Sequence, residues 1–342
     1  MKINRHIPHL ALALLTVCLP ACSSENSGDP DAPEAIGFFA TTDDAADARS
    51  FSPANMPSTL SVRAYNRTKK YFECNIARSG SEWTTDRQYF WPATGVDFYA
   101  FSLPEGASLI EGTRIRNNET WTTVSQVARF VVSTTAHEDA LWGTALDRTF
   151  KDNPVRLHMH HMLSRILFRA QVMDDNTDVD ISKITVRNAR NQGVYNLVPD
   201  VSTDRSDALG SWDVAGSRAN FSNGMSNIVI NGASDARQVM NAEGSAPYEL
   251  LLLPQQTDDV VLEVAYKLYN RSTAKYEVGS AAPGDFEART VEIPLRTWLQ
   301  NYSYTYTLQF KASDEVKVEI LTQPFAVNPF VAGGEITPPD KQ

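Results

Sequence analysis

The sequence has little cysteine. Three cysteines occur in 342 residues, and two of them, Cys18 and Cys22, lie near the N-terminus. Cys74 is then the one thiol left for the folded part, and a single thiol cannot form an internal disulfide. We therefore expect the fold to depend on its hydrophobic cores, and the chain is long enough to build two domains of ordinary size.

Basic charge and long apolar runs are also scarce. The chain carries 31 basic and 41 acidic residues, a formal net charge of −10. This balance argues against nucleic acid as a partner and against broad binding to anionic membranes. The apolar run Leu10–Leu19 is too short for a helix that spans a bilayer, and no later stretch is long enough either.

The N-terminus has the features of a bacterial lipoprotein signal. Lys2 and Arg5 precede the apolar run, and the "LPAC" that follows ends at Cys22. This order resembles a lipobox, in which a small residue precedes the cysteine that receives the lipid. We expect residues 1–21 to be the signal peptide, Cys22 to be lipidated and residues 22–35, which are polar and acidic, to form a flexible tether. The alternative is an ordinary secretory signal with an incidental cysteine.

Sustained helical periodicity is absent, and alternation with a period of two dominates instead. Such alternation, bounded by Gly, Pro, Asn and Asp, predicts antiparallel β-structure. One short helix is expected around His137–Leu146. The strand-like segments are residues 59–66, 96–103, 128–135, 180–188, 249–255, 258–270 and 302–311.

The turn-like "FKDNP" that ends at Asn153-Pro154 marks a natural division, because a long strand signal starts directly after it. We expect an all-β protein with an N-terminal domain over residues 36–153 and a C-terminal domain over residues 154–342. Each part has enough strands for its own antiparallel β-sandwich.

The segment "HMHHM" places His158, His160 and His161 within four residues. On a strand, His158 and His160 face one side and His161 the other, so at most two imidazoles share a face. A zinc site needs three or four protein ligands, and no further ligand motif lies nearby. We therefore expect a structural role and no metal. The acidic run Asp174–Asp180 lacks the Gly and Glu of an EF-hand loop and is interpreted as a turn.

Sequence signs of catalysis are missing as well. There is no Gly-x-Ser-x-Gly elbow and no phosphate-binding glycine loop before a helix. We expect neither an enzyme nor a cofactor. Of the six tryptophans, Trp83 and Trp121 lie in polar segments and are the better candidates for surface contact, whereas Trp91 and Trp298 are interpreted as structural.

Four segments together resemble the fimbrillin-like (Mfa-like) lipoproteins of Bacteroidales, the subunits of surface fimbriae. They are "RQYFWPATGVDFYAFSL" (Arg87–Leu103), "HMLSRILFRA" (His161–Ala170), "YELLLLPQ" (Tyr248–Gln255) and "NYSYTYTLQF" (Asn301–Phe310). They occur in the order of the family. The segment after Phe310 matches the family less well.

The resemblance implies two tandem β-sandwich domains of transthyretin-like topology and a function as a fimbrial subunit or accessory protein in adhesion. It also implies export as a lipoprotein to the surface of the outer membrane. There a trypsin-like protease cuts after an arginine that follows the first strand, and a strand of a neighbouring subunit replaces the strand that leaves. The implied partners are other fimbrial subunits, the outer membrane through the lipid, and a host or bacterial surface ligand.

The resemblance can be mapped onto this sequence. The first strand holds Ile36, Phe38 and Ala40, and Arg49 is the first basic residue after Cys22. A cut after Arg49 would release the anchor, the tether and the first strand together; the alternative is an uncut loop arginine. The candidate donor strand carries Val316, Val318 and Ile320, and its alternative interpretation is a plain final strand of the second domain.

A second function class stays open at this stage. A monomeric surface lipoprotein that binds glycans would use exposed tryptophans, and Trp83 and Trp121 are its main support.

Overall fold

The described part of the chain is built from β-strands. The computed structural model describes residues 33–42, 57–80, 82–134, 138–197, 210–244, 246–312 and 316–324. Within these ranges the one helical element is a short 3-10 helix, η2 (Phe150–Asp152). The all-β prediction is confirmed. Among the same residues no helix is long and apolar enough to cross a membrane.

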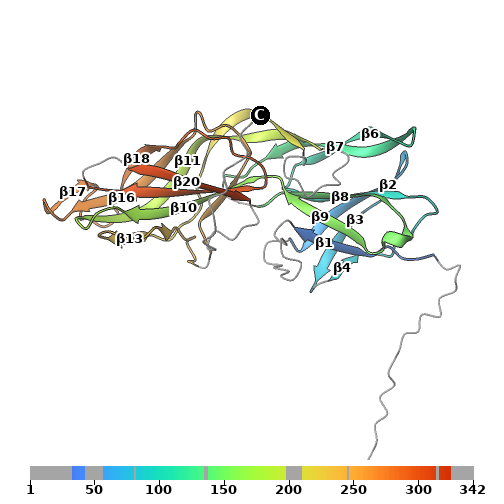
Figure 1. Cartoon of the computed structure of the whole chain (residues 1–342), viewed down its shortest axis with the longest axis horizontal. Helices are drawn as coiled ribbons and strands as arrows, with labels where there is room; N and C mark the ends of the chain where they lie inside the picture. The colour runs from blue at the N-terminus through green and yellow to red at the C-terminus, as the bar shows by residue number, and fades with distance from the viewer. Residues whose placement is uncertain are drawn as a thin grey trace, which may run out of the picture. The chain divides into compact units, whose positions relative to one another are not determined.

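The first sheet closes on itself as a barrel (Figure 1). The strand order around it is β1-β4-β3-β2-β5-β8-β9, and β9 pairs with β1 to close the ring. The β1–β9 ladder is parallel, and the other ladders of the barrel are antiparallel. The bounds are β1 (Phe38–Thr42), β2 (Thr59–Asn66), β3 (Lys69–Ser79), β4 (Glu82–Thr85), β5 (Val96–Ser102), β8 (Leu141–Arg148) and β9 (Val155–His161).

Two further sheets contain the remaining strands. In the smaller sheet, β10 lies at the centre and pairs in parallel with β19. Its strands are β10 (Ser164–Val172), β14 (Arg237–Gln238), β15 (Glu249–Leu252), β19 (Tyr302–Phe310) and β20 (Lys317–Pro324). The larger sheet has β6 (Ser108–Arg116), β7 (Glu119–Val131), β11 (Thr177–Asn196), β12 (Ser211–Phe221), β13 (Ile228–Asn231), β16 (Val261–Asn270), β17 (Lys275–Val278) and β18 (Glu287–Glu292).

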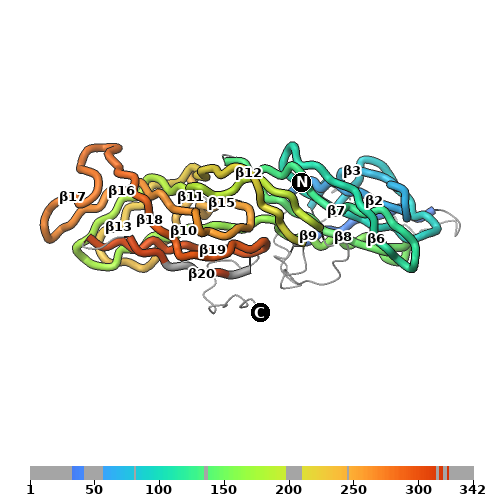
Figure 2. Tube along the Cα trace, turned by 90° about the horizontal axis from the view of Figure 1, so that it is seen from above, coloured from blue at the N-terminus to red at the C-terminus, as the bar shows by residue number. Residues whose placement is uncertain are grey.

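The long strand β11 links both parts of the larger sheet. Its first half pairs with β16, and its second half pairs with β7. The β6–β7 hairpin lies beside β2 of the barrel (Figure 2). There the Tyr65 hydroxyl donates to Glu111 at 2.7 Å, and the Thr122 N–H donates to the Arg67 carbonyl at 2.9 Å. The β6–β7 hairpin therefore extends the larger sheet to the outside of the barrel, beside β2.

Two apolar cores result from this arrangement. The barrel interior is one, and it contains alternate residues of β2, β5 and β9 such as Val62, Phe98 and Leu157. The other fills the space between the smaller and the larger sheet and extends to the outer face of β5 and β8. At that end the Trp142 indole N–H donates to the Tyr195 hydroxyl at 3.1 Å. The strands β5 and β8 are thus buried on both faces.

The short helix expected over His137–Leu146 is wrong where the structure describes it. Residues 141–146 belong to β8, and His137 lies outside the described residues. The physical reason is that both faces of β8 are covered: Leu141 and Ala145 point into the barrel, and Trp142 points into the other core. A strand buried on both faces loses its period-two pattern and cannot be told from a helix by apolar spacing.

The division at Asn153-Pro154 stays a prediction. β9, which follows it, pairs with β8 and β1, which precede it, whereas β10 begins the pairing with β15 and β19.

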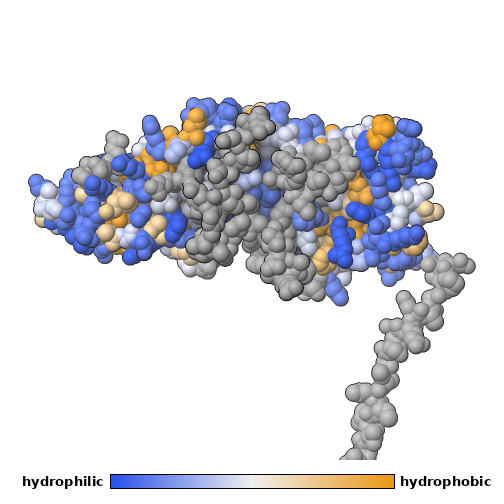
Figure 3. Space-filling model, viewed as in Figure 1, coloured by the Kyte–Doolittle hydropathy of each residue, from blue (hydrophilic) through white to orange (hydrophobic). Residues whose placement is uncertain are grey.

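The described residues on the face shown in Figure 3 are mainly hydrophilic with small apolar spots. Single apolar side chains of this kind are normal on protein surfaces.

Candidate functional site

The first strand, β1, is the element that the family resemblance predicts to take part in assembly. It pairs with β9 along its whole length, from Phe38 opposite Val155 to Thr42 opposite Met159. On its other side the pairing with β4 is limited to Phe38 opposite Trp83. β1 therefore has one full neighbour and one brief neighbour, although it closes the barrel.

The side chains of residues 36–40, which include the start of β1, alternate between the barrel core and the outside. Ile36 and Phe38 are buried in the barrel, and Ala40 packs against the same core. The Phe38 ring meets the edge of the Phe98 ring at a centroid distance of 5.7 Å and an angle of 84°. Phe39 faces away from the barrel core, and the guanidinium carbon of Arg156 lies 5.7 Å from the centroid of its ring. The residues predicted for the first strand thus fill an apolar groove.

Asn153 holds the chain just before β1. Its Oδ1 accepts the Gly37 N–H at 2.8 Å, and its Nδ2 donates to the Ala35 carbonyl at 3.1 Å. The Ile36 N–H donates to the Tyr89 carbonyl at 2.7 Å, so this segment is bound from two sides. The sequence does not predict Asn153 as a contact of the first strand, because its position before Pro154 indicates only a turn.

The groove around β1 is lined by apolar side chains of its neighbours. Val155, Leu157 and Met159 of β9 point inward, and Trp83 of β4 is buried beside them. The thiol of Cys74 lies in the same core, and burial raises its pKa to about 11. If β1 were removed, this lining and the unpaired edges of β4 and β9 would be open to another strand.

The three histidines lie on β9, next to β1. His158 and His160 share one face, with ring centroids 4.7 Å apart, and the Thr41 hydroxyl lies 3.4 Å from His158 Nδ1. His161 is fully buried, and its Nδ1 lies 2.5 Å from Asp139 Oδ2. Among the residues that the structure describes, no group of three or more His, Cys, Asp or Glu side chains could hold a metal ion.

The acidic run Asp174–Asp180 forms the connection from β10 to β11 and the start of β11. Asp174 Oδ1 accepts the Asn176 N–H at 2.8 Å and the Thr177 hydroxyl at 2.9 Å. Asp178 pairs with Arg271 at 2.7 Å. These two carboxylates are therefore used within the fold, as expected for a turn.

The remaining predicted site residues divide into two groups. Cys22 and Arg49 lie outside the described residues. The candidate donor segment forms β20, which pairs antiparallel with β19 of the same chain; Val318 lies opposite Leu308 and Ile320 opposite Tyr306. Val316 and Val318 pack against the larger core.

The interpretation of Trp83 and Trp121 as surface residues is wrong. Both are buried, with 7% and 4% of their surface exposed. Trp83 lies in the barrel core, and Trp121 lies under the guanidinium groups of Arg114 and Arg116 at 5.7 and 4.4 Å. Trp83 lies on the four-residue strand β4 and Trp121 near the start of the 13-residue strand β7, and polar neighbours conceal the burial of each in the sequence. Trp91 and Trp298 are buried, as predicted.

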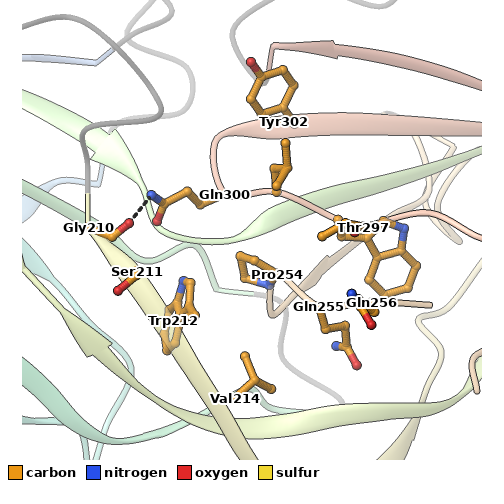
Figure 4. A pocket seen from close by; sticks show the side chains of 12 residues that line it. Gly210, Ser211, Trp212, Val214, Pro254, Gln255, Gln256, Thr297, Gln300 and Tyr302 are labelled. Carbon is orange, nitrogen blue, oxygen red and sulfur yellow. Dashed lines mark hydrogen bonds between the residues drawn. The ribbon is translucent and has the colours of Figure 1, made fainter. Parts of the chain in front are cut away.

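A pocket of about 460 Å³ opens beside β12 and the start of β19 (Figure 4). Trp212 and Val214 form one side of the pocket. Pro254 lies between them and Thr297. The side-chain amide of Gln300 donates to the Gly210 carbonyl at 3.0 Å. Among the residues that the structure describes, its lining has no Asp, Glu, His, Lys, Arg or Cys side chain.

Comparisons with known proteins agree with this architecture. Residues 26–324 match the protein family described as fimbrillin-like. A fimbrial protein from Bacteroides vulgatus has a similar structure, with a TM-score of 0.52 and 13% identity over 85% of this chain and 99% of that chain. A search of curated proteins finds no match.

Two more solved structures are similar at a lower level. A protein from Bacteroides ovatus assigned to cell adhesion has a TM-score of 0.49 and 14% identity over 87% of this chain and 99% of that chain. The fimbrial anchor protein Mfa2 from Porphyromonas gingivalis has a TM-score of 0.37 and 11% identity over 86% of this chain and 98% of that chain. At these scores neither carries an argument.

Proposed function

Since the chain belongs to the fimbrillin-like family, we propose that it is a subunit or accessory protein of an adhesive fimbria and that it assembles by exchange of its first strand. In this proposal β1 leaves the barrel, and a strand of a neighbouring subunit enters the groove. Main-chain hydrogen bonds to β9 and β4 supply the affinity, and the pockets for alternate side chains supply the specificity.

The environment of β1 is the observation that supports the proposal. Among the described residues, the strand closes the barrel with a full ladder to β9 and a single residue pair with β4. Burial of Ile36, just before β1, and of Phe38 in β1 contributes about 1.5–3 kcal/mol for each side chain. An incoming strand that places apolar residues at the same positions would recover this free energy, and the closed groove would then open slowly.

Export and processing complete the proposal. Cys22 carries the lipid that holds the precursor on the surface of the outer membrane, and a trypsin-like protease cuts after Arg49. Because no other basic residue lies between Cys22 and Arg49, this cut releases the anchor, the tether and β1 in one piece.

The segment with Val316, Val318 and Ile320 is the candidate donor. It forms β20, which lies at the edge of its sheet and, within the described part of the chain, pairs with β19 alone. An edge strand can leave with the loss of a single ladder. The donor role competes with the plain interpretation as a final strand, and truncation of β20 distinguishes the two.

Limited proteolysis tests the processing step. We expect mild trypsin to cut the full-length chain first after Arg49, as read by intact mass, and the Arg49→Ala variant to lack this cut. Early cleavage at other sites with Arg49 intact would argue against processing there.

The glycan-binding alternative has lost its main support, because Trp83 and Trp121 are buried.

A further inference from the structure

The outer face of β13, β11, β16 and β17 contains a second pocket. These strands lie side by side (Figure 1), and their inward residues, such as Val179 and Leu268, belong to the larger core. The opposite face is hollowed to a pocket of about 350 Å³. Two rows of paired residues cross its floor, Asn231–Asp178–Tyr269–Tyr276 and Val229–Asp180–Lys267.

The loop between β17 and β18 forms one wall of this pocket. Ala281 lines the pocket, and the Lys267 ammonium donates to the carbonyl of its neighbour Ala282. The same ammonium lies 4.9 Å from the centroid of the Phe286 ring. These contacts hold both the loop and the lysine side chain over the floor.

The polar groups of the pocket include an unused acceptor. The buried Oδ1 of Asp180 has no hydrogen-bond partner among the described residues, and burial raises the pKa of this carboxyl. A buried acceptor without a donor is unfavourable. Asp178 differs, because Arg271 donates to both of its oxygens at 2.7 and 2.9 Å. Asp180 lines the pocket, and its carboxylate is an acceptor for the O–H group of a ligand there.

Two tyrosines give the pocket an aromatic side. The rings of Tyr269 and Tyr276 lie 5.1 Å apart at an angle of 58°, and Tyr276 is 40% exposed. Aromatic faces of this kind pack against apolar surface while the hydroxyl stays in contact with polar groups. A pyranose ring has matching properties, since its C–H face is apolar and its hydroxyls both donate and accept.

We propose that this pocket binds a neutral sugar residue of a surface glycan. The C–H face of the sugar packs on Tyr276 and Tyr269, one hydroxyl donates to Asp180, and another accepts from Lys267 or Asn231. A cationic ligand fits less well, because Lys267 and Arg271 already place two positive charges beside the carboxylates. The volume lies in the range of sites for small ligands, about 300–1,000 Å³.

This inference goes beyond the proposed assembly and does not depend on it. The pocket residues belong to β11, β13, β16 and β17, whereas strand exchange concerns β1, β4 and β9. A failure of sugar binding would leave strand exchange untouched, and the reverse also holds.

The test uses the purified full-length chain on an array of immobilised neutral glycans that end in galactose, glucose, fucose or N-acetylglucosamine. We expect binding to at least one of these sugars. Tyr276→Ala and Asp180→Ala should weaken it at least tenfold, about 1.4 kcal/mol. Tyr71→Ala, a tyrosine 39% exposed on β3 of the barrel, and Asp213→Ala, on the exposed part of β12, are matched controls and should bind like the unaltered chain.

Three results would overturn the proposal. They are absence of binding to every neutral glycan, equal binding by the pocket variants and the controls, and selective binding to an immobilised amine in place of the sugars. Far-UV circular dichroism of each variant checks the fold. Because Tyr276 is partly exposed, its replacement leaves the core intact, so that the test stands even if Asp180→Ala does not fold.

Discussion

Phe38 and Phe39 are adjacent in β1 and have different environments. Phe38 lies in the barrel core against Phe98, whereas Phe39 faces the Arg156 guanidinium on the outside. We expect Phe38→Ala to lower the free energy of unfolding by about 3–5 kcal/mol, since it leaves a cavity in a closed core. Phe39→Ala is the matched control and should cost less than about 1 kcal/mol. Urea denaturation measures both, and equal losses would contradict this assignment of faces.

Cys74 gives a second test at the residue scale. Burial raises the pKa of its thiol to about 11, against an ordinary value near 8.5 in the unfolded chain. Its contribution to stability is therefore fully present below about pH 8.5 and is lost as the pH rises through about 11. Relative to Cys74→Ala, the unaltered chain should lose stability over this range. Denaturation of both at about pH 8 and about pH 10.5 measures the change, and a constant difference would argue against a buried thiol.

Single residues also show what the sequence could and could not predict. The alternation in residues 36–40 predicted which side chains of the first strand belong together, because a strand has a strict period of two. The burial of Trp83 and Trp121 was not predicted. Their neighbours are polar, and only the pairing of β4 with β1 and of β7 with β6 shows which face is covered.

At the scale of elements, the β6–β7 hairpin is fastened to the barrel by one buried ion pair. Asp97 of β5 is fully buried, and burial raises its pKa, while Arg114 of β6 donates to it at 2.7 and 3.0 Å. We expect Arg114→Met to destabilise the protein by about 3–5 kcal/mol, because it leaves an uncompensated buried charge. Thermal or urea unfolding measures the loss.

The control for this ion pair is Glu119→Ala. Glu119 pairs with Arg67 at 3.4 Å, and both side chains are about half exposed. Such surface pairs contribute up to about 1 kcal/mol. If Arg114→Met cost no more than Glu119→Ala, Asp97 would not be a buried charge that depends on Arg114.

The strand β1 should be the least protected strand of the barrel that lies within the described residues. It pairs with β4 at one position, whereas β2 has long ladders to both β3 and β5. Hydrogen exchange read by mass spectrometry should show faster exchange in Phe38–Thr42 than in Thr59–Asn66. Equal protection of both segments would mean that β1 opens only with the whole barrel.

Element prediction succeeded for β2 and for β5, although β5 is covered on both faces, and it failed for β8. Residues 59–66 were predicted as a strand and form β2 with the same bounds. Residues 141–146 of β8 were predicted as helical, because Leu141 and Trp142 are buried on opposite faces. The length of β11 was also missed, since its bulges interrupt the alternation.

At the scale of the whole molecule, the all-β class and the family follow from the sequence, but the closure of the first sheet does not. The barrel closes through the parallel contact of β1 with β9, which are more than 100 residues apart in the chain. Likewise, the sheet that joins β7 to β11 brings residues of both halves into one core. Neither contact leaves a local pattern, because each depends on pairing between distant strands.

The pairing of β1 also determines how the molecule would assemble. The strand that precedes the proposed cut after Arg49 is the one that closes the barrel. Its loss opens the edges of β4 and β9 together with an apolar groove. A subunit with β1 removed is therefore expected to bind a donor strand and not to remain free.

The most direct test of strand exchange is electrophoresis of the trypsin-treated chain without boiling. We predict an SDS-resistant ladder for the unaltered chain, and none for Arg49→Ala or for a cleaved chain that ends at Lys311 and so lacks β20. If the chain cut after Arg49 stays monomeric and keeps β1 bound, the central claim that β1 is exchanged for a donor strand is contradicted.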